Sequence, residues 1–463
     1  MKQIKLKFTT ILIFILLTLG IIFSTFTLTI KFNGAIFSQS LKSDKNLSYN
    51  ENLKSSVIWG KIHIDNNWSD AEIMGICTGN GTPNDPYIMK DLVIDGGNLG
   101  TCILIENSRA YFKIENCTFY HSGYVGGPDY MVGITLSNVT NSLLISNNCS
   151  NNFYGISLYN SHYNQIMDNM VTNNQLGIDL ESCDNITISR NRADNNSVGI
   201  NVFDGQNFNI SGNTANNNSR YGIYLRSSSN NIISENTANN NTAFGIYLRN
   251  SLYDDISKNT ANYNVVYGIY VRNSRYNNLS KNTANCNLVH GILLQDCRYG
   301  DIMDNNASFN ISWGIGLSTS NNTNFQGNCA NNNDVGLNLQ FNYNNLISGN
   351  RANFNHHYGI YLYYGDSNTI SGNTANNNIY GIFLQRSDTN IISGNILLGN
   401  TKCIFEEDCQ GNEFSDNGAC TYGEGEDGQN NIDIFIVILN IEIGILVIAL
   451  VILTIISKRK GKK

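Results

Sequence analysis

The sequence predicts an all-β chain folded as a single-stranded parallel β-helix, a solenoid of about 14 coils, with a transmembrane helix at each end. Three observations predict this fold. A glycine followed by an apolar residue recurs every 22 or 23 residues, and an asparagine recurs with the same period. Long apolar stretches lie close to both termini, and the N-terminal one carries no charge. Repeats of this length are typical of solenoids, which grow in one dimension and are not limited by the size of one compact core.

The recurring glycine opens a G-[IL]-x-[LV] element. The spacing is too short for ankyrin or tetratricopeptide repeats, and the leucine-rich pattern is absent. Each unit holds short alternating segments between Asn, Gly and Ser, which are typical of strands and turns. Alternation predicts that Ile223 and Leu225 face the core and that Tyr224 and Arg226 face outward. The glycines are Gly133, Gly155, Gly177, Gly199, Gly222, Gly245, Gly268, Gly291, Gly314, Gly336, Gly359 and Gly381.

The recurring asparagine follows an apolar residue by three positions. In a parallel β-helix the same position stacks on its copy at about 4.8 Å, so asparagine amides can pair along the column and satisfy buried polar groups. Asparagine also tolerates the left-handed backbone of sharp corners. The repeat therefore mainly specifies a shape. We expect the column to contain Asn148, Asn169, Asn191, Asn213, Asn236, Asn259, Asn282, Asn305, Asn328, Asn350, Asn373 and Asn395.

The two ends of the chain are predicted to lie in a membrane. Residues 1–30 form a retained signal anchor or, alternatively, a cleaved signal peptide, and 31–75 form a linker and an N-terminal cap. The β-helix spans 76–420, and an acidic, Gly-rich spacer follows at 421–433. Residues 434–456 form a transmembrane helix or, alternatively, a membrane-surface helix, because Asn440 and Glu442 weaken its apolar character. Residues 457–463 form a basic cytoplasmic tail, so the positive-inside rule predicts an extracellular β-helix at the cell membrane.

The charge distribution argues against a nucleic-acid partner. The formal net charge is −7, and eight of the 29 basic residues lie in the two ends, which leaves 21 against 36 acidic residues between them. Nucleic-acid binding requires a basic surface. The eleven cysteines contain no CxxC pair, so a zinc or redox motif is not expected. We expect most to pack in the core, although disulfides could stabilise the caps among Cys77, Cys102, Cys117, Cys403, Cys409 and Cys420.

The repeat N-x-I-S-G-N-x-x-x-N-N…Y-G-I-x-L is similar to that of right-handed parallel β-helix proteins of the NosD type, within the carbohydrate-binding and sugar-hydrolase β-helix group. The stretch from Cys77 to Gly123 resembles the opening coils of archaeal cell-surface proteins of this kind. The resemblance covers roughly residues 58–420 and implies a right-handed coil. It does not imply one activity, because the group includes binders, structural spikes, lyases, hydrolases, epimerases and an accessory protein for copper-enzyme maturation.

Three consecutive coils carry Tyr-x-Arg on the outward face. Tyrosine faces stack on sugar rings and arginine forks hold carboxylates or sulfates, so this strip is a candidate binding site for an anionic polysaccharide or surface glycan. The alternative is a solvated sheet stabilised by cross-strand and cation–π contacts, or a residue pair copied by repeat duplication. The candidate residues are Tyr224, Arg226, Tyr247, Arg249, Tyr270 and Arg272.

An acidic pair, Asp179 and Glu181, faces outward two coils before this strip. With the arginines it could serve a Ca²⁺-assisted polysaccharide lyase, or as a carboxylate pair it could serve a glycoside hydrolase. The alternative is a solvated acidic surface, and no polygalacturonase signature is recognisable. We therefore assign no catalytic residue, and Asp179 and Glu181 remain candidates only.

No resident metal is expected apart from this conditional calcium. Of the six histidines only His356 and His357 are adjacent, and neighbours on a strand face opposite ways, which disfavours a copper site. His290 occupies the position before the repeat glycine where other coils carry aromatic residues, so it is expected to stack there.

The sequence therefore predicts a membrane-anchored extracellular protein with a structural or carbohydrate-binding role and without catalysis. Its predicted partners are a glycan and, through the terminal helices, membrane lipid. The alternatives are a polysaccharide lyase or hydrolase, and an accessory protein for a surface metalloenzyme. A groove along the outward face would favour a glycan site, and a flat face a structural role. The insertion at 123–130 is the obvious loop for a groove wall.

Overall fold

The computed structural model describes residues 57–123, 131–418 and 422–424. The predicted terminal segments 1–30 and 434–456, the basic tail and most of the spacer lie outside the described residues. No helix within the described part of the chain is long and apolar enough to cross a membrane. The described residues form an all-β parallel solenoid of about 14 turns, which confirms the predicted coil architecture.

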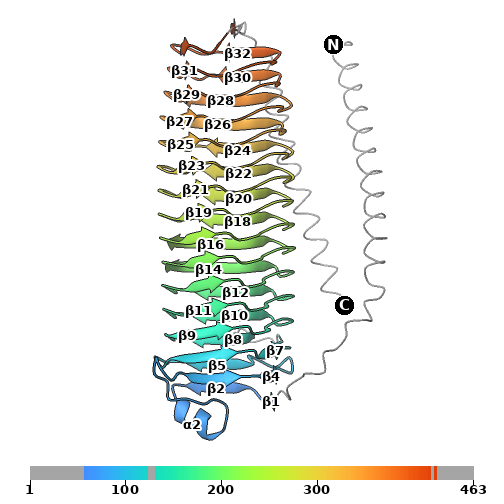
Figure 1. Cartoon of the computed structure of the whole chain (residues 1–463), viewed down its shortest axis with the longest axis vertical. Helices are drawn as coiled ribbons and strands as arrows, with labels where there is room; N and C mark the ends of the chain where they lie inside the picture. Colours follow the sequence, from blue (N-terminus) through green and yellow to red (C-terminus); the bar gives the residue numbers. More distant parts are fainter. Residues whose placement is uncertain (1–56, 124–130, 419–421, 425–463) are drawn as a thin grey trace, which may run out of the picture. The chain divides into compact units, whose positions relative to one another are not determined.

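Two long parallel sheets run the length of the solenoid (Figure 1). Each coil contributes one strand to each sheet, and paired residues are 22 or 23 positions apart throughout the regular coils. The 16-stranded sheet contains β2 (Ile62–Asp65), β5 (Ile103–Glu106), β8 (Val132–Ser137), β10 (Tyr154–Tyr159), β12 (Leu176–Glu181), β14 (Val198–Gln206), β16 (Tyr221–Ser229), β18 (Phe244–Arg249), β20 (Tyr267–Arg272), β22 (His290–Gln295), β24 (Trp313–Ser318), β26 (Val335–Tyr343), β28 (Tyr358–Asp366), β30 (Tyr380–Gln385), β32 (Lys402–Glu407) and β34 (Tyr422–Glu424).

The second long sheet is built from shorter strands. The 15-stranded sheet contains β3 (Tyr87–Lys90), β6 (Phe112–Glu115), β9 (Ser142–Ile145), β11 (Gln165–Met167), β13 (Thr187–Ser189), β15 (Asn209–Ser211), β17 (Ile232–Ser234), β19 (Asp255–Ser257), β21 (Asn278–Ser280), β23 (Asp301–Met303), β25 (Asn324–Gln326), β27 (Leu346–Ser348), β29 (Thr369–Ser371), β31 (Ile391–Ser393) and β33 (Glu413–Ser415).

The third side of the coil has strands only in the first coils, and single paired residues take their place in the later coils. It begins as the three-stranded sheet of β1 (Val57–Trp59), β4 (Leu92–Asp95) and β7 (Thr118–Tyr120). It continues as one isolated parallel bridge per coil, such as Thr214 to Thr237. The helix α2 (Trp68–Ile73) lies at the N-terminal end, where Trp68 is buried and its indole Nε1 donates to Ser108 Oγ over 2.7 Å.

The core consists of apolar columns that repeat from coil to coil. Ile223 and Leu225 are fully buried, which confirms the predicted alternation. The repeat glycine is required by close packing. A Cβ atom on Gly268 would lie 2.7 Å from the carbonyl oxygens of Ala261 and Gly291. Any larger residue here would push two coils apart, and this explains why the glycine recurs.

A column of buried asparagines joins the coils, as predicted. The backbone N and side-chain Nδ2 of Asn236 both donate to Asn259 Oδ1 over 3.0 Å, and the same Nδ2 donates to the Ile210 carbonyl over 2.8 Å. Within the ladder, such an amide is thereby fully hydrogen-bonded inside the protein. The ladder consists of Asn147, Asn169, Asn191, Asn213, Asn236, Asn259, Asn282, Asn305, Asn328, Asn350, Asn373, Asn395 and Asn417.

The first rung of this ladder is Asn147, so the prediction of Asn148 was wrong. Asn147 follows Leu144 by three positions, and Asn148 follows Ile145 by three positions. Leu144 is the fully buried residue of the two, so Asn147 occupies the ladder position. The left-handed corners are formed by other residues. Asn217 and Asn240, for example, have φ values of 56° and 57°. The two predicted uses of asparagine therefore fall on different positions.

The predicted disulfides at the N-terminal end are wrong. Cys77, Cys102 and Cys117 are free and buried, where they act as small apolar side chains. At the other end Cys403 is disulfide-bonded and Cys409 is free, while Cys420 lies outside the described residues.

An aspartate replaces asparagine in another buried column. Asn231 donates to Asp254 Oδ1 through its backbone N and Nδ2, over 3.0 and 2.8 Å. Asp254 is 1% exposed, and its Oδ2 has no hydrogen-bond partner among the described residues. Burial raises the pKa of this carboxyl to about 7, and the hydrogen bonds from Asn231 oppose the rise.

We expect Asp254→Asn to stabilise the protein at pH 8 and to do so much less at pH 4. Because the folded pKa lies above the unfolded value of about 3.9, the folded state binds more protons between these values, and stability falls as pH rises through this window. Asparagine removes that loss, on the order of 2–4 kcal/mol at pH 8. Thermal unfolding of both proteins from pH 4 to pH 8 measures the difference. An equal gain at both pH values would contradict the explanation.

Candidate functional site

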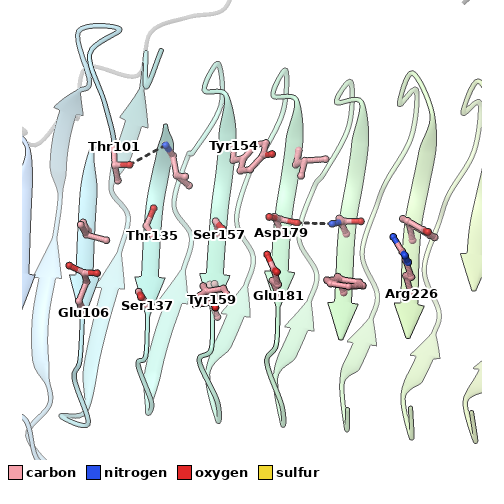
Figure 2. A pocket seen from close by; sticks show the side chains of 17 residues that line it. Thr101, Glu106, Thr135, Ser137, Tyr154, Ser157, Tyr159, Asp179, Glu181 and Arg226 are labelled. Atoms are coloured by element: carbon pink, nitrogen blue, oxygen red, sulfur yellow. Dashed lines mark hydrogen bonds between the residues drawn. The ribbon is translucent and has the colours of Figure 1, made fainter. Parts of the chain in front are cut away.

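A groove of about 600 Å³ lies on the outer face of the 16-stranded sheet, across β5 to β16. Figure 2 shows its side chains in rows along successive strands, from Glu106 at one end to Arg226 at the other. Its lining mixes apolar and aromatic side chains with polar and charged groups. The polar and charged groups include Glu106, Ser137, Ser157, Asp179, Glu181 and Arg226.

The groove exists because side chains two positions after the repeat glycine change in size along the solenoid. In β8 to β14 they are small, namely Thr135, Ser157, Asp179 and Asn201. In β16 the same column reaches Tyr224, which pairs in register with Asn201. Tyr224 lines the groove at this end. Small side chains thus leave a hollow that the first large ring closes.

Beyond Tyr224 the face is filled by two aromatic columns. The rings of Tyr224, Tyr247 and Tyr270 stack nearly parallel, with 4.9 Å between successive centroids. Tyr247 and Tyr270 are only 6% and 7% exposed. The second column covers them and consists of Tyr221, Phe244, Tyr267, His290 and Trp313.

The flat faces of Tyr247 and Tyr270 therefore contact other rings and not solvent. The predicted stacking of three tyrosine faces on a sugar does not fit this geometry, and only Tyr224 of the three lies in the groove. His290 is buried between Tyr267 and Trp313, which confirms its predicted stacking role. Burial lowers the pKa of His290 to about 3.

The three arginines of the predicted strip form an exposed column. Arg226, Arg249 and Arg272 pair in register on β16, β18 and β20. The guanidinium of Arg226 lies 5.1 Å from the centre of the Phe203 ring. Within the described residues, the arginines with a carboxylate at ion-pair distance are others, namely Arg190, Arg192 and Arg386.

Three like charges one strand apart, about 4.8 Å, repel one another. No carboxylate of the described chain relieves that repulsion at ion-pair distance. The column therefore offers a row of guanidinium donors to an anionic ligand, and guanidinium groups bind carboxylates and sulfates in a bidentate manner.

The acidic candidates lie inside the groove. Asp179 is partly buried and Oδ1 accepts a 2.7 Å hydrogen bond from Asn201 Nδ2 (Figure 2). Burial raises the pKa of Asp179 to about 6. The Asn201 hydrogen bond opposes this rise and the charge of Glu181 adds to it. One strand separates this pair from Tyr224 and Arg226. The structure thus brings four of the eight candidate residues into one groove.

The adjacent histidines are not on a strand, so the prediction that they face opposite ways was wrong. His356 and His357 lie in the bend before β28. Their Nδ1 atoms are 3.2 Å apart, and both face Asp334 Oδ1, over 3.4 and 2.6 Å. A bend frees consecutive side chains from strict alternation, and these two converge on one carboxylate.

Three stretches of the sequence, 42–192, 113–287 and 290–420, match the family described as periplasmic copper-binding protein (NosD). The chain belongs to this family. The match covers the solenoid and confirms the resemblance seen in the repeat. No curated protein matches the sequence.

Several solved structures resemble the solenoid. The A-module of mannuronan C-5 epimerase AlgE6 from Azotobacter vinelandii is 14% identical, with a TM-score of 0.50 over 69% of this chain and 91% of that chain. The AlgE4 A-module from the same organism is 16% identical, with a TM-score of 0.46 over 74% and 97%. DFA-IIIase from Arthrobacter chlorophenolicus is 12% identical, with a TM-score of 0.39 over 61% and 78%. At these identities the likeness shows the fold alone.

Sequence reasoning missed the groove, although its signal is present. The change from small residues to tyrosine at the Gly+2 position, between Asn201 and Tyr224, marks where the hollow ends. It also missed Glu106 and Ser137, which line the groove from earlier coils. The predicted wall loop, 123–130, lies almost wholly outside the described residues.

We expect two neighbouring substitutions to shift the pKa of Asp179 in opposite directions. Asn201→Leu keeps the site shielded but removes a hydrogen bond to the charged carboxylate, so the pKa should rise well above 6. Glu181→Gln removes a like charge, so the pKa should fall. Carboxyl-carbon NMR titration of Asp179 measures both. Shifts of the same sign in the two variants would contradict this account of the groove.

Proposed function

We propose that this NosD-family chain binds an acidic glycan along the outer face of the 16-stranded sheet, at the cell exterior and without catalysis. The observation that supports this proposal best is the groove that leads to the arginine column, which has no carboxylate of the described residues at ion-pair distance. A hollow lined by hydroxyl, amide and carboxylate groups suits a polar chain, and the guanidinium groups beyond it suit anionic substituents. A purely structural face has no need of either feature.

The aromatic columns have a supporting role in this proposal. Stacked rings hold β16, β18 and β20 rigidly, so the arginines that follow them on the same strands keep a fixed spacing. Little ordering of the site is then needed when a ligand binds, which favours affinity. Tyr224 is the ring that the ligand would contact, at the end of the groove.

The exterior location is part of the proposal. The matched family is described as periplasmic, and the predicted segments 8–30 and 434–456 would anchor the solenoid on the outer side of a membrane. The likeness to the mannuronan epimerase module supports the solenoid architecture only. The choice of an acidic glycan rests on the groove and the arginines of this chain.

We expect simultaneous Ala substitution of Arg226, Arg249 and Arg272 to abolish binding of polyuronate and sulfated oligosaccharides. The loss of three charge-assisted contacts should weaken binding by at least about 100-fold, since each contributes about 1.5–3 kcal/mol. Glycan-array screening followed by calorimetry, at low and high salt, measures the effect. The matched control is the double variant Arg275→Ala and Arg298→Ala, which removes two exposed arginines bridged in register outside the groove.

The control should retain wild-type binding, and neutral glycans should bind neither protein. Equal loss in the control would show general charge attraction and would contradict a defined site. No binding of any acidic glycan by the wild type would leave a structural or protein-binding solenoid.

The titration of Asp179 favours a second candidate function, proton transfer in a polysaccharide lyase or hydrolase. A carboxyl with a pKa of about 6 exchanges protons near neutral pH, which suits a general acid or base. Glu181 faces the same groove and Ca²⁺ could assist beside a uronate. Chromatography of bound polyuronate after incubation, with and without Ca²⁺, separates the two functions. Shortened products that disappear in Asp179→Asn would support catalysis, and an intact chain would exclude it for that substrate.

A further inference from the structure

Two successive coils carry potential metal ligands at one bend. Backbone hydrogen bonds connect this bend from coil to coil, and the connected positions are Ala243, Val266, Val289, Ser312, Asp334 and His357. Asp334 directly precedes β26 and His357 directly precedes β28. His357 N donates to the Asp334 carbonyl over 2.9 Å, and His356 N donates to the Asn333 carbonyl over 2.8 Å. The strands therefore fix the three side chains in one place.

We propose that Asp334, His356 and His357 bind one divalent transition-metal ion, with copper(II) preferred. Two of the three separations between the side-chain atoms already have the required spacing, and the third is slightly shorter. The separations are 2.6 Å from His357 Nδ1 to Asp334 Oδ1, 3.4 Å from His356 Nδ1 to the same oxygen, and 3.2 Å between the Nδ1 atoms. Ligands at about 2.0–2.1 Å from a metal lie roughly 2.9–3.4 Å apart at octahedral or tetrahedral angles. An ion fits beside the three atoms with only a small lengthening of the shortest separation.

The donor set selects the class of metal. Two imidazole nitrogens and one carboxylate oxygen suit copper and zinc, whereas calcium requires six or more oxygen ligands. Copper(II) binds nitrogen and oxygen ligands more tightly than zinc in the Irving–Williams order. The matched family is described as copper-binding, which agrees with this choice. The choice of copper itself rests on the donor atoms of these three residues.

The site is open on the solvent side. The side chains of His356, His357 and Asp334 are 74%, 44% and 38% exposed. Three protein ligands leave coordination positions that water or a partner protein can occupy, and an open site of this kind can load and release its ion. This proposal is independent of glycan binding, because none of the three residues lines the groove on β5 to β16.

The experiment titrates copper(II) and zinc(II) into the chelator-treated full-length protein, followed by calorimetry and by electron paramagnetic resonance of the copper form. We expect one tight copper equivalent with two coordinated nitrogens, weaker binding of zinc, and no binding of calcium at this site. His357→Ala should weaken copper binding about 100-fold or more and leave one coordinated nitrogen, since even loss of an outer partner of a ligand costs about 10–100-fold.

The matched control is His63→Ala, which breaks a histidine–carboxylate pair that lacks a second histidine, with His63 Nε2 at 2.9 Å from Glu106. This variant should keep wild-type copper affinity and spectra. Thermal unfolding without metal shows that both variants remain folded. Equal weakening in both variants, or a copper spectrum unchanged by His357→Ala, would overturn the site. Unchanged copper binding in the Arg226, Arg249 and Arg272 triple variant would confirm that the two sites are independent.

Discussion

The asparagine ladder is the interaction on which the rest of the structure depends. Every ladder amide before the last, Asn417, donates to the next amide and to a backbone carbonyl of the coil before it, as Asn236 does to Asn259 and Ile210. An unpaired buried amide would cost about 1–3 kcal/mol, so each rung stabilises its neighbours only when the same residue recurs in every coil. The 22- or 23-residue period is the sequence expression of this constraint. Asp254 shows the reverse, because a carboxylate in such a column leaves one oxygen without a partner.

This constraint fixes the inward positions and leaves the outward positions free. The core columns and the repeat glycine vary little, since a Cβ at Gly268 would collide with two carbonyl oxygens. On the outer face, by contrast, the same column changes from Ser157 to Asp179 and then to Tyr224. One change of side-chain volume there creates a groove without disturbing the backbone. Residues that give this chain a function of its own are therefore expected on the outer face and at the bends.

The sequence predicted the coil and its inside because these follow from local alternation and a single period. Ile223 and Leu225 point inward in each copy, and no long-range information is needed to see it. The aromatic packing could not be predicted in this way. Whether the face of Tyr247 is open depends on Phe244 of its own strand and on Tyr221 and Tyr224 of the preceding coil, which only the coil-to-coil geometry brings into contact with it. The choice of Asn148 in place of Asn147 was wrong because only the structure shows that Leu144, and not Ile145, is the fully buried residue.

The candidate sites were predicted unevenly for a related reason. Asp179 and Glu181 lie on a strand, where alternation correctly placed both outward, and in-register pairing aligned them with the arginine column. His356 and His357 lie in a bend, where alternation does not hold. The alternation rule for strands therefore predicted opposite directions for two side chains that in fact converge. The approach of Asp334 from the preceding coil then adds a third donor, which is separated by 22 and 23 positions along the chain.

Solenoid energetics explain how such sites can coexist. Stability is approximately a sum of contacts between neighbouring coils, so a change at one coil is felt little several coils away. The groove lies on β5 to β16 and the histidine bend on β26 to β28, with β18 to β24 between them. The ladder from Asn147 onward and the glycine column from Gly133 onward continue without a break from the β8–β16 part of the groove to the histidine bend. A substitution at a bend or on the outer face therefore leaves intact the interactions that hold the coils together. Either site can change without affecting the other.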